Sequence, residues 1–139
     1  MHLLSTCELY LADNDINGPV LTEVGLLSNT KEFFLSYTVM TGSIPSELAL
    51  LTKLEFIDLV NNAFGGTIPE ELYLGDFDDL LMLDLGGNQF SGTISTNVGQ
   101  LRMMVFLYFD DNPYLIGTIP SEIGLLERLQ KLHVANSGL

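Results

Sequence analysis

The sequence has little positive charge. Among its 139 residues, five are Lys or Arg and 18 are Asp or Glu, and the formal net charge is −13. A protein with this charge repels nucleic acid and anionic lipid, and it attracts cationic partners. The composition therefore excludes nucleic acid from the partners that we expect.

Cysteine and histidine are also scarce. With Cys7 as the single cysteine, the chain cannot form an internal disulfide or a thiolate metal cluster. His2 and His133 lie near opposite ends of the sequence, so no spacing pairs them as zinc ligands or places either as a base beside a nucleophile. We expect no metal, no cofactor and no enzymatic activity.

Long apolar runs are missing as well. No stretch approaches the roughly 18 apolar residues of a membrane helix, so we expect no membrane insertion by this segment. The opening MHLLSTCELY has neither the basic region nor the apolar run of a signal peptide. Because 47% of the residues are hydrophobic, the chain can still bury a core, and residues 1–139 are predicted to form one domain.

The main feature that the sequence does contain is an internal repeat. The motif G-T-I-P occurs at 66–69 and 117–120, with G-S-I-P at 42–45 as a near copy. Glycines recur every 24–26 residues, at Gly18, Gly42, Gly66, Gly92 and Gly117. Two positions after each glycine stands a β-branched residue that we expect to face the core: Val20, Ile44, Ile68, Ile94 and Ile119. A period of this length predicts a solenoid of stacked units.

Each unit also contains a short alternating apolar segment before its glycine. The alternation of inward and outward residues predicts one short strand per unit. The inward pairs are Leu9 and Leu11, Phe33 and Leu35, Ile57 and Leu59, Leu83 and Leu85, Leu107 and Phe109, and Leu132 and Val134. After the glycine turn, a proline near an acidic residue, as in Pro45-Ser46-Glu47, predicts a short helix that begins at the proline.

A polar column follows the predicted strands. The position three residues after the second inward residue of a strand holds asparagine in four units: Asn14, Asn62, Asn88 and Asn112. Each Asn amide can donate to one coil and accept from another, which predicts a ladder of hydrogen bonds along the stack. Thr38 and Ser137 occupy the same position in two units and satisfy only part of that demand, so we expect looser turns there.

The repeated residues carry a resemblance to a known family. Residues Leu54 to Leu74 and Leu80 to Leu101 follow LxxLxLxxN and then xFxGxIPxxLGxL, a pattern that resembles the plant-type leucine-rich repeat. The local departures are Ser95 in place of a proline, 18–20 in place of G-x-I-P and an extra residue in 112–117. The resemblance implies an α/β solenoid, a right-handed superhelix of about five repeats of 24–26 residues and a partial sixth. It also implies a parallel sheet on the concave face and short 3-10 or helical segments on the convex face.

The same resemblance implies a role in recognition. Relatives of this kind bind proteins, peptides or glycans, often outside the cell or on receptor ectodomains, so an extracellular or cell-surface location is implied. The chain begins and ends inside repeats without complete caps, and we interpret it as a fragment of a longer repeat or receptor-like protein. In an alternative interpretation it is a structural segment of a larger receptor, such as a receptor-like kinase, whose ligand contacts lie elsewhere.

The outward residues of the predicted strands, with the two residues after each strand, define a candidate binding face. Its columns hold seven acidic residues and one basic residue, interleaved with aromatic side chains. Aromatic side chains exposed on one face are typical anchors of an interface. We therefore predict a protein or peptide partner of basic or mixed charge. The predicted contact residues are Tyr10, Phe34, Tyr37, Phe56, Asp58, Asp84, Phe106, Tyr108, Asp110 and Asp111.

Two alternatives explain parts of this face without a ligand. Aromatic pairs on neighbouring strands stabilise a sheet by about 0.2–1 kcal/mol each. Asp58 and Asp84 repel each other, and either a bound cation or solvation with salt screening can offset that repulsion. Elsewhere, the acidic segment 76–79 lacks the spacing of a calcium loop, and turn chemistry explains the hydroxyl residues that follow the repeat glycines.

Overall fold

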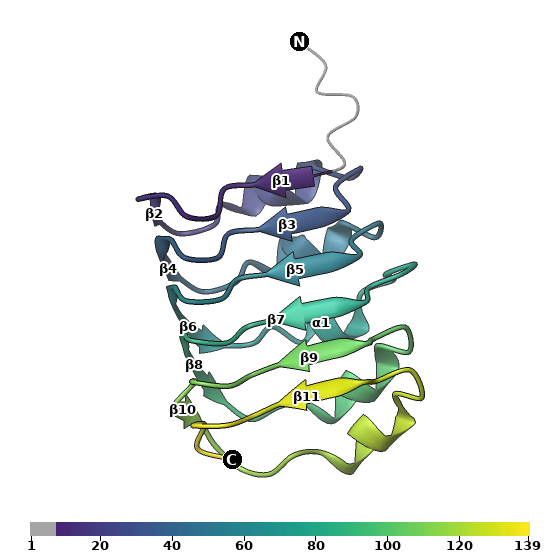
Figure 1. Cartoon of the computed structure of the whole chain (residues 1–139). Coiled ribbons are helices and arrows are strands. Elements are labelled where there is room, and N and C mark those ends of the chain that lie inside the picture. Colours follow the sequence, from purple (N-terminus) through teal and green to yellow (C-terminus); the bar gives the residue numbers. More distant parts are fainter. Residues whose placement is uncertain (1–7) are drawn as a thin grey trace.

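The computed structural model describes residues 8–139, so the predictions for His2 and Cys7 lie outside the described part of the chain. Within it, successive coils stack along one axis, and each contributes one strand to a parallel sheet of order β1-β3-β5-β7-β9-β11 (Figure 1). The strands are β1 (Glu8–Tyr10), β3 (Glu32–Phe34), β5 (Phe56–Asp58), β7 (Met82–Asp84), β9 (Phe106–Tyr108) and β11 (Lys131–His133). The prediction of one short strand per unit is confirmed.

A second parallel sheet, of order β10-β8-β6-β4-β2, runs along one side of the stack (Figure 1). Its strands are β2 (Asn17–Gly18), β4 (Val39–Gly42), β6 (Ala63–Thr67), β8 (Gln89–Gly92) and β10 (Tyr114–Leu115). The sequence pattern predicts only turns here, because most of these strands contain the repeat glycines. The turn glycines remain essential: Gly42 and Gly92 have φ values of 82° and 80°, a region that side chains disfavour.

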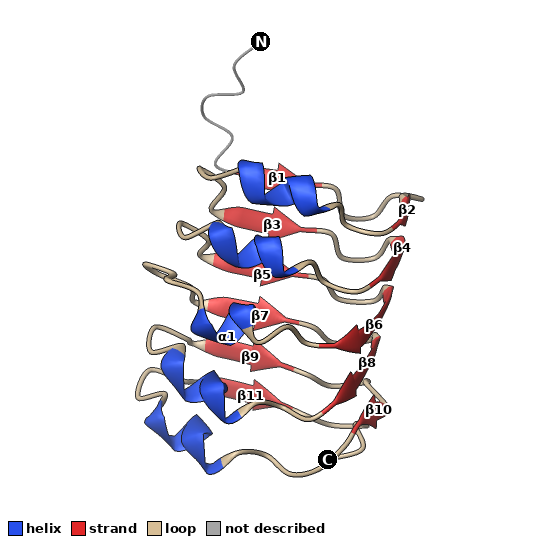
Figure 2. Cartoon of the chain, turned by 180° about the vertical axis from the view of Figure 1, so that it is seen from behind, coloured by secondary structure: helices blue, strands red, loops and turns tan. Residues whose placement is uncertain are grey.

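Short helices cover the back of the six-stranded sheet (Figure 2). They are η1 (Thr22–Leu26), η2 (Ser46–Leu50), α1 (Glu71–Leu74), η3 (Thr96–Gln100) and η4 (Ser121–Leu125), where η marks a 3-10 helix. All of these helices in residues 8–139 are far shorter than a bilayer-spanning segment. The prolines stand just before them rather than inside the first turn: Pro45 and Pro120 keep extended backbone. In the fourth unit Ser95 replaces the proline, and its hydroxyl accepts from Asn97 N at 3.1 Å.

The core lies between the six-stranded sheet, the helices and the second sheet. The inward isoleucines Ile44, Ile68 and Ile94 are buried, as predicted, and Val20 is half-buried. Ile119 contradicts the prediction, since 43% of its surface is exposed. It belongs to the last full coil, and each inward residue owes its burial to neighbours on both sides of its coil.

The asparagine ladder forms as predicted at Asn62, Asn88 and Asn112, but the prediction is wrong for Asn14, whose amide donates within its own coil because it stands in the first coil. Asn112 Nδ2 donates to the Leu85 carbonyl of the preceding coil at 2.9 Å, and Asn112 Oδ1 accepts from Phe90 N at 3.0 Å. Asn88 and Asn62 repeat this pattern one and two coils earlier, respectively. These bonds satisfy backbone groups that the coil-to-coil turns would otherwise leave unpaired inside the protein. At Thr38, which is also buried, the hydroxyl lies within hydrogen-bond distance of the Leu35 carbonyl and of Asn62 Oδ1.

Candidate functional site

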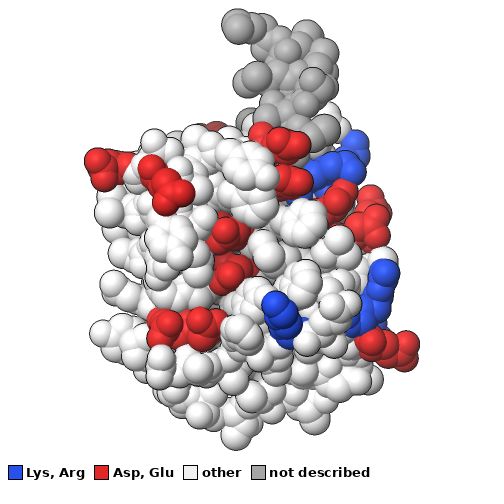
Figure 3. All heavy atoms as spheres, viewed as in Figure 1, with Lys and Arg blue, Asp and Glu red and all other residues white. Residues whose placement is uncertain are grey.

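The outward residues of the six-stranded sheet form two rows across the strands, because neighbouring strands pair in register. One row follows the order Glu8, Glu32, Phe56, Met82, Phe106 and Lys131. The other follows the order Tyr10, Phe34, Asp58, Asp84, Tyr108 and His133. We call this surface the sheet face. Figure 3 shows acidic side chains gathered over its middle, with uncharged surface around them.

Two carboxylates occupy the centre of the sheet face. Asp58 and Asp84 are directly opposite each other on β5 and β7. Asp58 accepts hydrogen bonds from Ser36 Oγ at 2.9 Å and from Val60 N at 3.0 Å, and Asp84 accepts from Gly86 N at 3.0 Å. These bonds hold the two like charges side by side despite their repulsion.

The pKa of Asp84 is raised to about 6. Burial of the carboxyl is the largest cause, and the charges of Asp58 and Asp110 add to it. The Gly86 backbone amide and His133 act in the opposite direction. A cation bound between the two carboxylates would stabilise the ionised form of Asp84 against the charges of Asp58 and Asp110.

Aromatic rings flank the carboxylates on both sides. Toward the N-terminal edge, the rings of Tyr10 and Phe34 lie 4.6 Å apart, centroid to centroid. Toward the C-terminal edge, Tyr108 lies 6.5 Å from the Phe106 ring and 4.7 Å from the His133 ring. The contacts of Tyr10 with Phe34 and of Tyr108 with His133 fit the cross-strand packing that needs no ligand, yet they also leave aromatic surface beside the carboxylates.

Carboxylates perturb two of the tyrosines. A hydrogen bond from the Tyr10 hydroxyl to Glu32 is the main cause that raises the pKa of Tyr10 to about 12. The pKa of Tyr108 is also raised, first by burial and then by the charges of Asp84 and Asp110. Both hydroxyls therefore stay protonated at neutral pH and remain hydrogen-bond donors.

Three predicted contact residues lie just beyond the strands. The Asp110 carboxyl reaches toward Gly86, since a Cβ atom added at that glycine would lie 3.5 Å from Asp110 Cγ. Tyr37 and Asp111 both have a φ of 53°, which places them in the left-handed region. This conformation suits Asp and Asn but is unfavourable for a tyrosine, and 57% of Tyr37 is exposed. The fold thus holds an exposed aromatic ring in a costly conformation at the rim of the sheet face.

Several side chains that take part in this arrangement are not among the predicted contact residues. Ser36 binds Asp58, and Lys131 Nζ lies 5.6 Å from the centroid of the Phe106 ring. Met82 and His133 complete the two rows. Their positions in the repeat columns place them on this face, but the columns do not indicate which neighbour each one contacts.

Asp84→Asn is expected to stabilise the fold at neutral pH by about 1 kcal/mol, after solvent screening is allowed for. The pKa of Asp84 is about 6 in the folded state, above the ordinary value of about 3.9 for an unfolded chain. The folded protein therefore binds the extra proton between about pH 4 and pH 6, and its stability falls as the pH rises through that window. Thermal unfolding should show an advantage of the variant at pH 7 that disappears near pH 4.

Asp13→Asn serves as the control for this titration, because Asp13 is an exposed acid in the same left-handed position as Asp111. The variant shows how much of the stability change follows from the loss of one negative charge on the surface. An advantage of Asp84→Asn that is independent of pH would contradict the raised pKa.

Comparison with known proteins identifies leucine-rich repeats in the chain. The Leucine Rich Repeat family profile matches residues 53–74 and 79–101. No curated protein sequence matches the chain significantly. The fold is similar to the plant peptide hormone receptor RGFR1 in complex with RGF2, with a TM-score of 0.89 and 28% identity over 94% of this chain and 20% of that one.

Two Arabidopsis receptor kinases are similar as well. HAESA, solved with the peptide hormone IDA and the co-receptor SERK1, has a TM-score of 0.89 and 32% identity over 96% of this chain and 22% of that chain. The SOBIR1 ectodomain has a TM-score of 0.84 and 27% identity over 93% of this chain and 69% of that chain. This chain thus spans about a fifth of the two peptide receptors and about two thirds of the shorter ectodomain.

Proposed function

The chain is a leucine-rich repeat protein of the plant type, and we propose that its sheet face binds an extended peptide segment of basic or mixed charge without catalysing a reaction. The observation that carries the proposal is the register pair of Asp58 and Asp84, bracketed by aromatic rings. A Lys or Arg side chain lying between the carboxylates would neutralise their repulsion, and the rings beside it would contact apolar parts of the same segment.

The size of the sheet face suits a short peptide. Six strands about 4.8 Å apart span roughly 24 Å, the length of about seven extended residues. The net charge of −13 would draw a cationic segment to the protein and speed their encounter. Two of the similar receptors were solved with peptide hormones, which supports a peptide as the bound class. An open sheet offers no cleft in which paired carboxylates act as acid and base, and this favours binding over catalysis.

Selection from phage-displayed random heptapeptides tests this function. We expect the enriched peptides to carry Lys or Arg together with apolar residues. Replacing Phe56 and Tyr108 with Ala and Asp84 with Asn in one variant should weaken the enriched peptides at least about tenfold, because central aromatic and charged contacts dominate such interfaces. Circular dichroism should show the variant folded, since all three side chains lie on the outer side of the sheet.

Tyr114→Ala is the matched control, because Tyr114 is an exposed aromatic residue on β10, outside the sheet face. Its peptide affinity should match that of the original protein. Enrichment of acidic peptides, or equal binding by the triple variant, would overturn the assignment of the sheet face.

A second candidate function is that of a structural segment in a larger receptor whose ligand contacts lie elsewhere. The observation that favours it is that this chain spans only about a fifth of the length of the two peptide receptors. The same selection separates the two functions, because a structural segment should enrich no heptapeptide above an unrelated control protein.

A further inference from the structure

The third coil departs from the regular repeat on the helical side of the stack, away from the sheet face. Leu72 and Leu80, two buried leucines that frame its return loop, stand eight positions apart, whereas the equivalent pair Leu48 and Leu54 stands six apart. The two extra residues fall in segment 75–79, Gly-Asp-Phe-Asp-Asp. In this loop a Cβ atom at Gly75 would lie 2.7 Å from the Phe77 ring, so the glycine lets the ring fold back against the loop.

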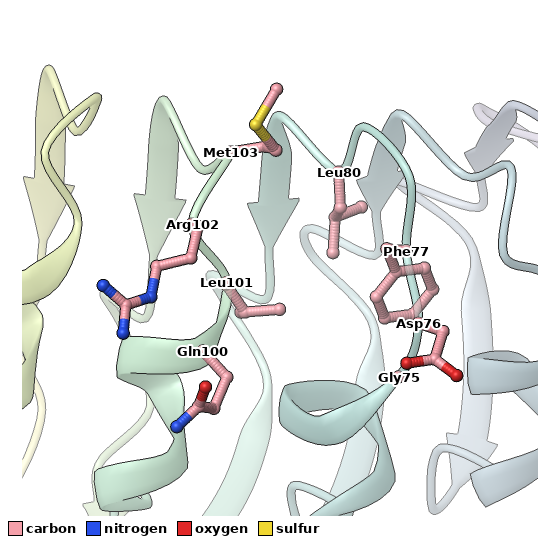
Figure 4. Close-up of a pocket in the computed structure, with 8 residues that line it drawn as sticks. All are labelled: Gly75, Asp76, Phe77, Leu80, Gln100, Leu101, Arg102 and Met103. Atoms are coloured by element: carbon pink, nitrogen blue, oxygen red, sulfur yellow. The ribbon is translucent and has the colours of Figure 1, made fainter.

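Two hollows adjoin this loop, one on each side. The first, of about 280 Å³, is lined by Phe77, Leu80, Leu101 and Met103 among others. Figure 4 shows Phe77 and Leu101 on opposite sides of the hollow with Leu80 between them, while the Arg102 guanidinium extends away from Phe77. The second hollow, of about 300 Å³, lies toward the second coil and is lined by Leu50 and Leu74 among others. Gly75 and Asp76 line both.

The leucines beside the second hollow are largely exposed, as is Leu26 in the same repeat column. Leu50 is 62% exposed and Leu74 is 55% exposed. They occupy one repeat column, and the fourth coil carries Gln100 at that position. The column therefore tolerates a polar residue, and the fold does not require leucine there. Exposed leucines that border a hollow mark a candidate contact surface.

The charge around the hollows indicates what would cover them. Glu71, Asp76, Asp78 and Asp79 are all exposed beside the loop, and Arg102 is the basic residue of the first hollow. A second copy docked on this surface would bring two acidic loops together, and an anionic bilayer would be repelled in the same way. A partner with basic flanks would instead be attracted.

We propose that the two hollows on either side of Gly75 and Asp76 form a second docking surface, which binds a short basic amphipathic helix of a partner protein. Two apolar side chains of the helix enter the hollows, and its Lys or Arg residues face Asp76, Asp78 and Asp79. A helix suits two adjoining hollows, because its side chains at i and i+4 lie on one face about 5–6 Å apart. This surface is separate from the sheet face, so both can be occupied at once.

The probe for this surface is a synthetic helical peptide of Leu and Lys, compared with its analogue in which Glu replaces Lys. Fluorescence anisotropy at physiological ionic strength should show saturable binding of the Lys peptide and at least tenfold weaker binding of the Glu analogue. Leu50→Gln with Leu74→Gln should weaken the Lys peptide at least tenfold, and the variant should stay folded, since Gln100 occupies the same column. Asp76→Asn with Asp78→Asn and Asp79→Asn should weaken it severalfold.

Leu26→Gln is the matched control, because Leu26 lies in the same column at 81% exposure but lines neither hollow. It should bind the Lys peptide within twofold of the original protein, and so should the Phe56, Asp84 and Tyr108 triple variant. The proposal is overturned if the Lys peptide fails to saturate, if the Leu50 and Leu74 variant binds as tightly as the control, or if only the sheet-face variant loses binding. Light scattering that shows a dimer of the original protein, lost in the Leu50 and Leu74 variant, would assign the surface to a second copy instead.

Discussion

Asn112→Ala is expected to lower the free energy of unfolding by about 4 kcal/mol, because each buried polar group left without a partner costs about 1–3 kcal/mol. Asn112 is fully buried, and its amide bonds two coils together. Without the side chain, Phe90 N loses its acceptor and the Phe109 carbonyl loses the donor of Asn112 inside the protein, whereas the Leu85 carbonyl keeps the donor of Asn88. Urea unfolding followed by circular dichroism would measure the loss.

Asn14→Ala is the internal control for this change. Asn14 occupies the same repeat position, but it is exposed, and its amide donates to the carbonyls of Leu11 and Ala12 within its own coil. Water can replace both bonds, so the cost should stay near 0.5 kcal/mol or less. Equal losses for the two variants would show that the coil-to-coil bonds contribute little to the stability of the stack.

The contrast between these two asparagines illustrates what the sequence predicts and what it leaves open. The repeat period predicts that residues of one column share a position in their coils, and the burial of Ile44, Ile68 and Ile94 confirms this. Burial also depends on the coils on either side. The exposure of Ile119 therefore follows from its place in the stack rather than from its motif.

The second sheet was missed for a different reason. Its strands are short, and four of the five contain glycine, as in Gly65 and Gly66 of β6, which weakens the usual strand signals. These strands pair with the equivalent segments of neighbouring coils, so they form only where the coils are stacked. Such an element depends on the assembled stack, and the pattern of one unit does not contain it.

For the sheet face, strand alternation predicts which side chains share a surface, and the register of Asp58 with Asp84 confirms that part. The contact of Ser36 with Asp58 and the raised pKa of Asp84 depend on distances between coils, which no column of letters specifies. The sequence also does not predict the hollows beside segment 75–79. The 26-residue interval between Gly66 and Gly92 indicates extra residues in this coil but not how they fold. Whether the ten predicted contact residues bind a ligand stays a prediction.

Asp84→Lys is expected to have opposite effects on stability and on binding. The new ammonium group would lie opposite Asp58 in register and near the Asp110 carboxyl, so it would replace a repulsion among acids with attraction. We expect the thermal midpoint to rise, while affinity for a basic heptapeptide falls about a hundredfold, because truncating or reversing one partner of a close charge pair costs about 2–5 kcal/mol. Asp84→Asn should give a smaller loss, near tenfold, since Asp58 keeps its charge.

Comparing the peptide affinity of Asp84→Lys with that of Asp13→Lys distinguishes a charge-selective site from a merely acidic surface. If long-range attraction alone held the peptide, changing the net charge from −13 by two units would weaken binding only modestly, and the same reversal at Asp13 would weaken it equally. If the carboxylate pair holds a cationic side chain, the loss is large at Asp84 and small at Asp13. Isothermal titration of both variants with one basic heptapeptide decides between these outcomes, because only the second requires a cation to lie between Asp58 and Asp84.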